Sequence, residues 1–305
     1  KKTKWKEKNF MNATMSLDKI KHYPVMLNQV LSIISPQHGG TFIDCTFGGG
    51  GYSKAILKFP KTNVHAFDRD KITKKYADKL KKEFPDRFNF YHEKFSNLDK
   101  ISQKNIKPRA IIFDLGLSLY QLADQERGFS FKSSNSLNME MGINEYTAYD
   151  VVNTLDKEYL STIIKVLGDE KDGKKIASKI VEYRNKKPIK TSEELALIIK
   201  DAKKNFYYNK KNPATKTFQA IRMFVNCELT ELMSGLINAT QILREGGLLI
   251  VVSFHSLEDK IVKSFFNLYS NLRKNPSRYF PIKEKKPNLF KLILRKPIIP
   301  KKEEI

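Results

Sequence analysis

The sequence predicts an α/β fold in which a parallel sheet is interrupted by an inserted helical segment. Three observations support this prediction. Short β-branched and aromatic stretches alternate with stretches of helical period up to residue 116, a pattern typical of strands joined by helical crossovers. From about residue 128 to residue 212 the period is helical throughout. A fully apolar stretch at 248–254 then resumes the strand pattern, as expected of a strand buried in a parallel sheet.

Four strands and two helices are expected before the insertion. The strands cover 41–47, 63–68, 88–95 and 110–116. The first helix covers "YSKAILKF" at 52–59, and the second carries Ile72, Tyr76, Leu80 and Phe84 at helical spacing. Strands connected in this way pair in parallel through right-handed crossovers. Their carboxyl ends should therefore meet at one edge of the sheet.

Helices are expected throughout the insertion and again after it. Apolar stripes at helical spacing predict helices over about 160–167, 176–183 and 195–199. A long helix should run from Pro213 to Leu236, because proline suits a first helical turn. The remaining expected elements are the strand at 248–254, a helix at 256–270 and a last strand candidate at 290–299.

The composition is strongly basic. The chain of 305 residues has 56 Lys and Arg against 33 Asp and Glu, a formal net charge of +23. Such an excess attracts polyanions such as RNA. Only ten of the basic residues are arginine, so a lysine-rich composition without nucleic-acid binding is an open alternative.

Several classes of protein are disfavoured by the same sequence. We expect no membrane span and no secretion signal, because no apolar run approaches the roughly 18 residues that a span needs. Cys45 and Cys227 lie far apart within apolar patterns and without metal-ligand spacing. We therefore expect a cytoplasmic protein with two buried thiols and no metal.

Four consecutive glycines follow the first strand in "TFIDCTFGGGGYS" at 41–53. A glycine turn between a strand and a helix lets a ligand approach backbone amides that side chains would cover. Asp68 follows Gly48 by 20 residues, at the end of the second strand, where a carboxylate accepts hydrogen bonds from ribose hydroxyls. Both NAD and S-adenosylmethionine fit this pattern.

Asp114, at the end of the fourth strand, favours a methyl donor over a dinucleotide. An acid followed by a loop at this edge lines the crevice where donor and acceptor meet. A structural aspartate at a strand end is the alternative, and a nicotinamide dehydrogenase is the disfavoured enzyme class.

Seven motifs carry a resemblance to a known family: "HYPVMLNQVL" at 22–31, "TFIDCTFGGGGYS", "AFDRD" at 66–70, "DLGLSLYQLADQERGFSF" at 114–131, "GDEKDGKKIASKIV" at 168–181, "PATKTFQAIRMFVNCEL" at 213–229 and "SFHSLEDKIVKSF" at 253–265. On these motifs the chain resembles the bacterial cytosine-N4 methyltransferases of 16S ribosomal RNA, of the MraW or RsmH type. The resemblance implies a Rossmann-like class I methyltransferase domain over 22–127 and 213–305. It also implies an inserted helical RNA-recognition domain over 128–212, after a basic N-terminal extension over 1–21.

The resemblance also implies an activity and a set of cofactor contacts. S-adenosylmethionine would donate a methyl group to the N4 amine of a cytidine in the decoding centre. The partner would be small-subunit ribosomal RNA or the assembling small subunit, and a homodimer is left open. Cofactor positions that match the family are Gly50, Gly51, Tyr52, Asp68, Phe95, Asp114 and Gln121.

The chain departs from the family at several positions. Tyr52 replaces the usual histidine, and residues 117–123 replace Val-Ser-Ser-Pro-Gln-Leu-Asp. Asn138, Glu140 and Gly142 interrupt the usual Leu-Asp-Met-Arg-Met-Asp. The family's closing Asn-Pro-Arg-Ser-Arg-Ser segment is absent, which predicts a truncated chain or a sheet one strand short. A catalytically impaired RNA-binding assembly factor is therefore the alternative function.

Three residues are candidates for the chemistry. Asp114 is the first, because it can accept a hydrogen bond from the amine. Tyr120 could stack on the target base, although a loop tyrosine more often serves in packing. His255 follows the last strand and could relay a proton. Its alternative role is to brace the loop, with Ser256 capping the next helix.

The segment "KKNFYYNKKN" at 203–212 interleaves aromatic residues with lysines, which suits contact with phosphates and unpaired bases. A solvated charged loop is the alternative. The expected RNA-binding residues are Lys203, Lys204, Tyr207, Lys210, Lys211, Lys216 and Arg222.

Overall fold

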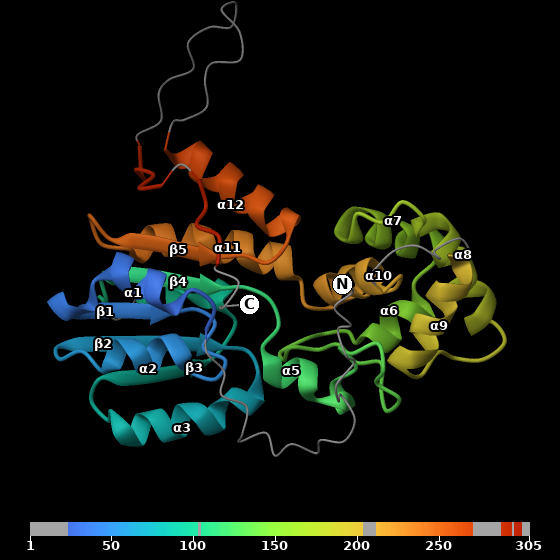
Figure 1. Cartoon of the computed structure of the whole chain (residues 1–305), viewed down its shortest axis with the longest axis horizontal. Helices are drawn as coiled ribbons and strands as arrows, with labels where there is room; N and C mark the ends of the chain where they lie inside the picture. The colour runs from blue at the N-terminus through green and yellow to red at the C-terminus, as the bar shows by residue number, and fades with distance from the viewer. Residues whose placement is uncertain (1–23, 103–104, 204–211, 271–287, 295, 301–305) are drawn as a thin grey trace, which may run out of the picture.

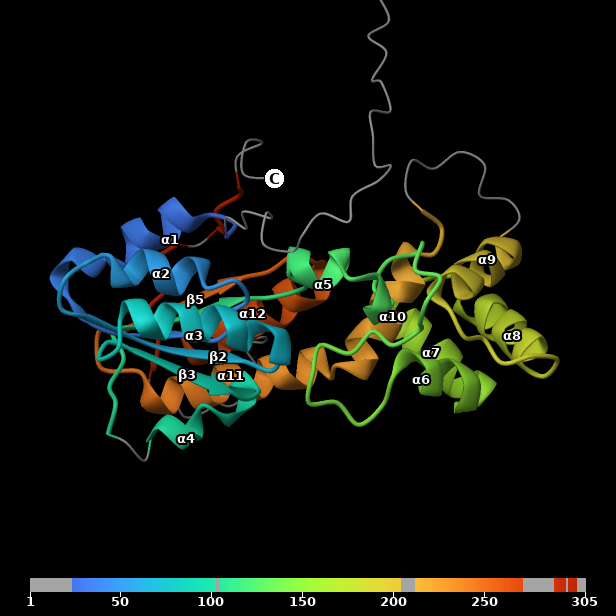
Figure 2. The same cartoon turned by 90° about the horizontal axis from the view of Figure 1, so that it is seen from below.

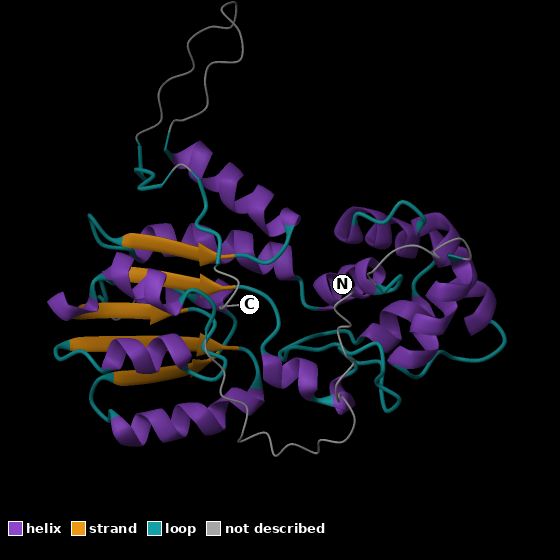
Figure 3. Ribbon diagram, viewed as in Figure 1, coloured by secondary structure: helices purple, strands orange, loops and turns teal. Residues whose placement is uncertain are grey.

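The computed structural model describes residues 24–102, 105–203, 212–270, 288–294 and 296–300. Within these residues one parallel sheet contains β1 (Gly40–Asp44), β2 (Thr62–Asp68), β3 (Phe88–His92), β4 (Ala110–Asp114) and β5 (Leu248–Val252). The strand order is β3-β2-β1-β4-β5, and the order reverses between β1 and β4. All strand ends point toward a separate group of helices, as Figure 3 shows. Ligands of open α/β sheets bind at such a reversal point.

Helices cover both faces of the sheet. One face carries α1 (Leu27–Ile34), α2 (Gly51–Leu57) and α3 (Lys74–Glu83), and the other carries α4 (Asp99–Ser102), α11 (Glu228–Ile242) and α12 (Ser256–Tyr269) (Figure 2). Successive strand residues alternate between the two cores, since Phe42 packs in the first and Ile43 in the second. Both faces are therefore apolar, which explains the nearly continuous apolar runs in the sequence.

A second group of helices forms its own core beside the sheet (Figure 1). We call this group the helical unit: α6 (Ala148–Thr154), α7 (Lys157–Gly168), α8 (Gly173–Arg184), α9 (Ser192–Ala202) and α10 (Thr215–Val225). Thr147 and Thr191 begin α6 and α9 with reciprocal capping bonds to Asp150 and Glu194. The helical pattern predicted for the insertion is thus present in the fold.

Short elements connect these two parts. Helix α5 (Leu119–Ala123) lies between the carboxyl edge of the sheet and the helical unit (Figure 1). The 3-10 turns are η2 (Pro36–His38), η3 (Lys71–Thr73), η4 (Phe95–Asn97) and η5 (Gln125–Arg127).

The prediction of one continuous helix from Pro213 to Leu236 is wrong in one respect. It breaks at Asn226 and Cys227 into α10 and α11, and Cys227 has a left-handed φ of 51°. Helix α10 then buries its apolar side in the helical unit, whereas α11 covers the sheet. The predicted boundary at residue 212 stays a prediction, and the packing of α10 favours a boundary near Asn226.

Two further expectations need correction. No strand forms in the described part of 290–299, so the sheet ends at β5 within the described chain. Cys227 is exposed because it follows the helix break, whereas Cys45 is buried as predicted. No helix among the described residues is both long and apolar enough to span a membrane.

Candidate active site

A cavity of about 720 Å³ opens at the carboxyl edge of the sheet. The glycine loop after β1, the ends of β2 and β4, and the segment after β5 all contribute to its wall. The cavity therefore lies at the reversal of strand order, where the sequence predicted a ligand.

The glycine loop lies close against the protein behind it. A Cβ on Gly50, whose φ is 79°, would lie 2.8 Å from the ring of Phe47, and a Cβ on Gly49 would lie 3.0 Å from the ring of Tyr120. Gly48, Gly49 and Gly51 line the cavity, while Gly50 forms the turn that begins α2. The glycines thus keep a stretch of bare backbone beside the ligand space.

Asp68 connects this loop to β2. Its Oδ2 accepts a hydrogen bond from the Gly48 amide at 2.7 Å, and its Oδ1 accepts one from the Asp70 amide at 2.8 Å. Burial raises the pKa of Asp68 to about 7. A carboxylate has further lone pairs beyond these two bonds, and Asp68 lines the cavity, so it can still accept bonds from a ligand.

Asp114 ends β4 on the same edge. Its Oδ1 is buried and accepts no hydrogen bond from the described residues. Burial, followed by the nearby carboxylates of Asp44 and Glu258, raises the pKa of Asp114 to about 7. Native proteins rarely leave a buried carboxyl oxygen unsatisfied, and at a cavity wall such an atom indicates a ligand that supplies the missing donor.

The other expected cofactor residues fall around the same cavity. The Tyr52 hydroxyl donates to the Val25 carbonyl, so the tyrosine fixes the chain before α1. Phe95 packs edge-on against Phe113, with ring centroids 5.3 Å apart. Gln121 donates from Nε2 to Asp70 at 2.8 Å and accepts from the Ser118 amide at 3.0 Å, so its amide holds α5 against the end of β2.

Tyr120 does not present a free face at the cavity. The side chain is 8% exposed, contacts Gly49 and lies 5.0 Å from the ring of Tyr76. The packing alternative therefore fits Tyr120 better than stacking on a target base.

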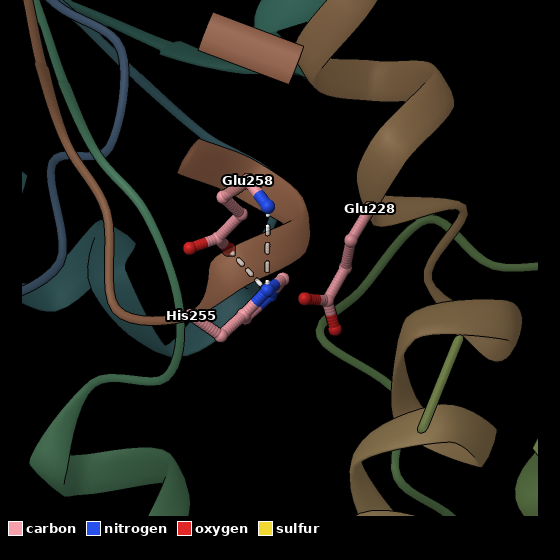
Figure 4. Close-up of side chains that lie close together, drawn as sticks. All are labelled: Glu228, His255 and Glu258. Atoms are coloured by element: carbon pink, nitrogen blue, oxygen red, sulfur yellow. Dashed lines mark hydrogen bonds and ion pairs between the residues drawn. The ribbon is translucent and has the colours of Figure 1, made fainter. Parts of the chain in front are cut away.

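His255 caps α12 instead of Ser256. Its Nδ1 accepts from the Glu258 amide at 3.4 Å, which in the neutral imidazole leaves the proton on Nε2, 3.0 Å from Glu258 Oε1. Figure 4 shows Glu228 beside this pair, and the three side chains have the types and the spacing of a metal site. Glu228, however, already binds the Arg222 guanidinium through both oxygens, at 2.7 and 2.9 Å. All three side chains thus already have partners within the protein, Glu228 in Arg222 and His255 in Glu258, which disfavours a metal site.

Comparison with known proteins places the chain in a family. The family model described as the MraW methylase family matches residues 19–305. The chain belongs to the MraW methylase family. It is 43% identical to the ribosomal RNA small subunit methyltransferase H of Ehrlichia chaffeensis over 288 residues, which cover 93% of this chain and 94% of that protein. It is 47% identical to the methyltransferase of the same name from a Wolbachia strain of Drosophila simulans over 248 residues, 80% of this chain and 84% of the relative. These matches confirm the predicted family, fold class and enzyme class.

Only part of the predicted RNA surface of the methylase is described. Lys204, Tyr207, Lys210 and Lys211 lie outside the described residues. Lys203 is buried and binds Glu170 at 2.7 Å, so it is unsuited to contact a phosphate. Arg222 is occupied by Glu228, which likewise disfavours an RNA contact. Lys216 is about half exposed, with its Nζ 2.6 Å from the Asp169 carbonyl oxygen.

Sequence reasoning missed a set of bonds that ties the end of β2 to the segment before α6 and to the residue that ends α10. Arg69 donates to the Gly142 carbonyl at 2.5 Å, to the Asn226 carbonyl at 2.8 Å and to Asn144 Oδ1 at 2.9 Å. Asp70 binds Arg127, which also donates to the Glu140 carbonyl at 2.5 Å. Arg69 and Asp70 directly follow Asp68 in the sequence. The "DRD" triplet was the available signal, although its partners are distant in sequence.

Proposed function

We propose that the protein transfers a methyl group from S-adenosylmethionine to the N4 amine of a cytidine in the decoding centre of small-subunit ribosomal RNA. The family and the names of the relatives support ribosomal RNA methylation. The choice of cytidine rests on the family resemblance. The observation that carries the proposal is the unsatisfied, buried Oδ1 of Asp114 at the wall of a glycine-lined cavity.

The charge of the cavity supports a cationic donor. Six carboxyl groups line it, against the cations Arg69 and Lys94. These acids are Asp68, Glu93, Asp114, Glu228, Glu231 and Glu258. S-adenosylmethionine carries a sulfonium, an ammonium and a carboxylate, and so has a net positive charge. A dinucleotide would bring its negative pyrophosphate to the same acids, so the cavity disfavours NAD.

The residues present fit this donor. When bound, S-adenosylmethionine supplies an activated methyl group on a positively charged sulfur. Asp68 would accept hydrogen bonds from the ribose hydroxyls, and Phe95 would pack beside the adenine. The bare backbone at Gly48 and Gly49 would leave room for the methionine part.

Asp114 would hold and activate the acceptor. The exocyclic amine of cytosine is a poor nucleophile because its lone pair is delocalised into the ring. A hydrogen bond from the amine to Asp114 Oδ1 would orient the nitrogen and increase its electron density. As the new carbon–nitrogen bond forms, an amine proton must leave, and a carboxyl with a pKa of about 7 is matched to accept it near neutral pH. Alignment of the nitrogen with the methyl group supplies much of the remaining rate enhancement.

We further propose that the helical unit recognises RNA and that the protein acts in the cytoplasm. A net charge of +23 favours a polyanionic partner. Among the described residues predicted to bind RNA, Lys216 is the best placed. The partner would be naked ribosomal RNA or the assembling small subunit.

Transfer of labelled methyl groups to small-subunit RNA, followed by nucleoside mass analysis, tests this function. The wild-type protein should form N4-methylcytidine. Asp114→Asn should reduce the rate by about 100-fold or more, because a carboxamide cannot take the proton. Donor binding without any N4-methylcytidine would instead support the alternative of an RNA-binding assembly factor. Thermal stabilisation by S-adenosylhomocysteine but not by NAD serves as the control for the donor.

A further inference from the structure

An exposed aromatic ring borders the cavity beside Asp114. Phe254 follows β5 by two residues and lines the cavity, yet 56% of its surface is exposed. Its position is fixed by its backbone, because its amide donates to Glu258 Oε2 at 2.9 Å and Glu258 is almost fully buried. The loop thus holds a large, partly exposed apolar ring at the wall of the cavity.

The register of the sheet places this ring next to Asp114. Asp114 pairs with Val252, and the Leu115 amide donates to the Val252 carbonyl at 3.0 Å. The segments that leave β4 and β5 therefore start side by side. Gly116, with a φ of 99°, lies close to the ring, since a Cβ there would be 3.4 Å from Phe254 Cδ2.

A second apolar side chain borders the same cavity. Leu119, the first residue of α5, lines the cavity and is 50% exposed. Single exposed apolar residues are common on protein surfaces. These two, on different segments, line the same cavity as the unsatisfied carboxyl oxygen of Asp114, and we call the pair the apolar slot. That arrangement matches a flat base with an amine on its edge.

We propose that Phe254 stacks on the acceptor base, that Leu119 closes the other side of the slot, and that the amine edge of the base meets Asp114. This inference rests on the proposed function and assigns the base contact to Phe254 in place of Tyr120. The ring would supply affinity for any base, whereas the hydrogen bond to Asp114 favours a base with an amine over uracil. Phe254 is a positioning residue, since it holds the base while Asp114 acts on the amine.

Phe254→Ala and Phe254→Tyr test the inference in steady-state methylation of small-subunit RNA. Loss of a base-stacking ring corresponds to about 5- to 150-fold in affinity, so Phe254→Ala should lower kcat/KM for RNA by that factor. Phe254→Tyr keeps the ring and should stay within about threefold of wild type. Both variants should bind S-adenosylmethionine and unfold thermally as wild type does. Leu268→Ala, at an exposed site on α12 outside the cavity wall, is the matched control.

Phe254→Trp gives a readout that needs no turnover. RNA that contains the target cytidine should quench the indole fluorescence more strongly than RNA with uridine at that position. The wild-type protein, whose single tryptophan is Trp5, provides the background. An unchanged kcat/KM in Phe254→Ala, or no quenching by either RNA, would overturn the assignment of Phe254, and equal quenching by both RNAs would overturn the contact between the amine and Asp114. Failure of the proposed function would look different, because wild type itself would form no N4-methylcytidine.

Discussion

Binding of the methyl donor should release protons near neutral pH. Burial raises the pKa of both Asp68 and Asp114 to about 7, so each carboxyl group is about half protonated at that pH in the free protein. Ribose hydroxyls and a sulfonium both favour the ionised carboxylates. A group with a pKa of 7 is about 9% ionised at pH 6 and about 91% ionised at pH 8. If only the ionised forms bind, affinity rises about tenfold per carboxyl group over this interval.

Titration calorimetry measures this linkage directly. At pH 7, in buffers of different ionisation enthalpy, the heats should report release of about half a proton per carboxyl group, or about one in total. Asp114→Asn should halve the number of protons released. S-adenosylhomocysteine, which lacks the sulfonium charge, should retain mainly the part that belongs to Asp68. Affinity that is constant between pH 6 and 8, with heats independent of buffer, would refute the reasoning.

Four further outcomes are expected. The pKa values of Asp68 and Asp114 are raised, so the folded protein binds more protons than the unfolded chain between about pH 4 and 7. The Tm of the ligand-free protein should therefore fall as the pH rises through that window. The fall should be smaller in Asp114→Asn. Gly142→Ala should destabilise the protein in urea by about 1–3 kcal/mol or more, because φ is 118° and the added Cβ would lie 2.1 Å from the Arg69 carbonyl oxygen; an unchanged midpoint would contradict this. Asp70→Ala should cost about 3–5 kcal/mol, since it leaves the largely buried Arg127 guanidinium without its carboxylate partner, and a loss below about 1 kcal/mol in urea would exclude that role. A thiol reagent should label one cysteine of the native protein, and Cys227→Ser should abolish the labelling.

The sheet could be predicted because its signals are local. Each strand is a short apolar run between turn residues, and both faces of the sheet are covered, so the runs are nearly continuous. The positions of Asp68 and Asp114 follow from the same signals, because the last residue of a parallel strand lies at the ligand edge. The placement of Asp68 and Asp114 at the wall of the cavity was thus accessible from the sequence.

The helix break between α10 and α11 could not be predicted, because its cause is tertiary. Asn226 is fully buried, donates to the Met139 carbonyl at 2.8 Å and accepts from the Met141 amide at 2.7 Å. These bonds join the end of α10 to a loop more than 80 residues earlier. The apolar period continues through the break, so the sequence indicates one helix. The exposure of Cys227 follows from the same break.

The departures from the family around 137–142 acquire a structural role. Gly142 lies against the Arg69 backbone in a conformation that favours glycine, and Asn138 accepts from the Glu140 amide at 2.8 Å. The Glu140 carbonyl accepts from Arg127, so the backbone there forms a bond that needs no particular side chain. The altered residues thus hold the loop in place. Their departure from the family pattern therefore gives little support to the alternative of a catalytically impaired protein.

The distribution of charge assigns the two proposed substrates to different parts of the molecule. The chain has a formal net charge of +23, yet six acidic residues and only two basic residues line the cavity. A polyanion is attracted to the molecule at long range, but its phosphates are repelled by the carboxylates inside. A small cation is drawn into the cavity, where low solvent exposure strengthens the attraction. An RNA strand could therefore insert only an uncharged part, the base, and the apolar slot of Phe254 and Leu119 is the entrance that suits a base. The same separation would let one protein bind the two proposed ligands, which have opposite charges, at the same time.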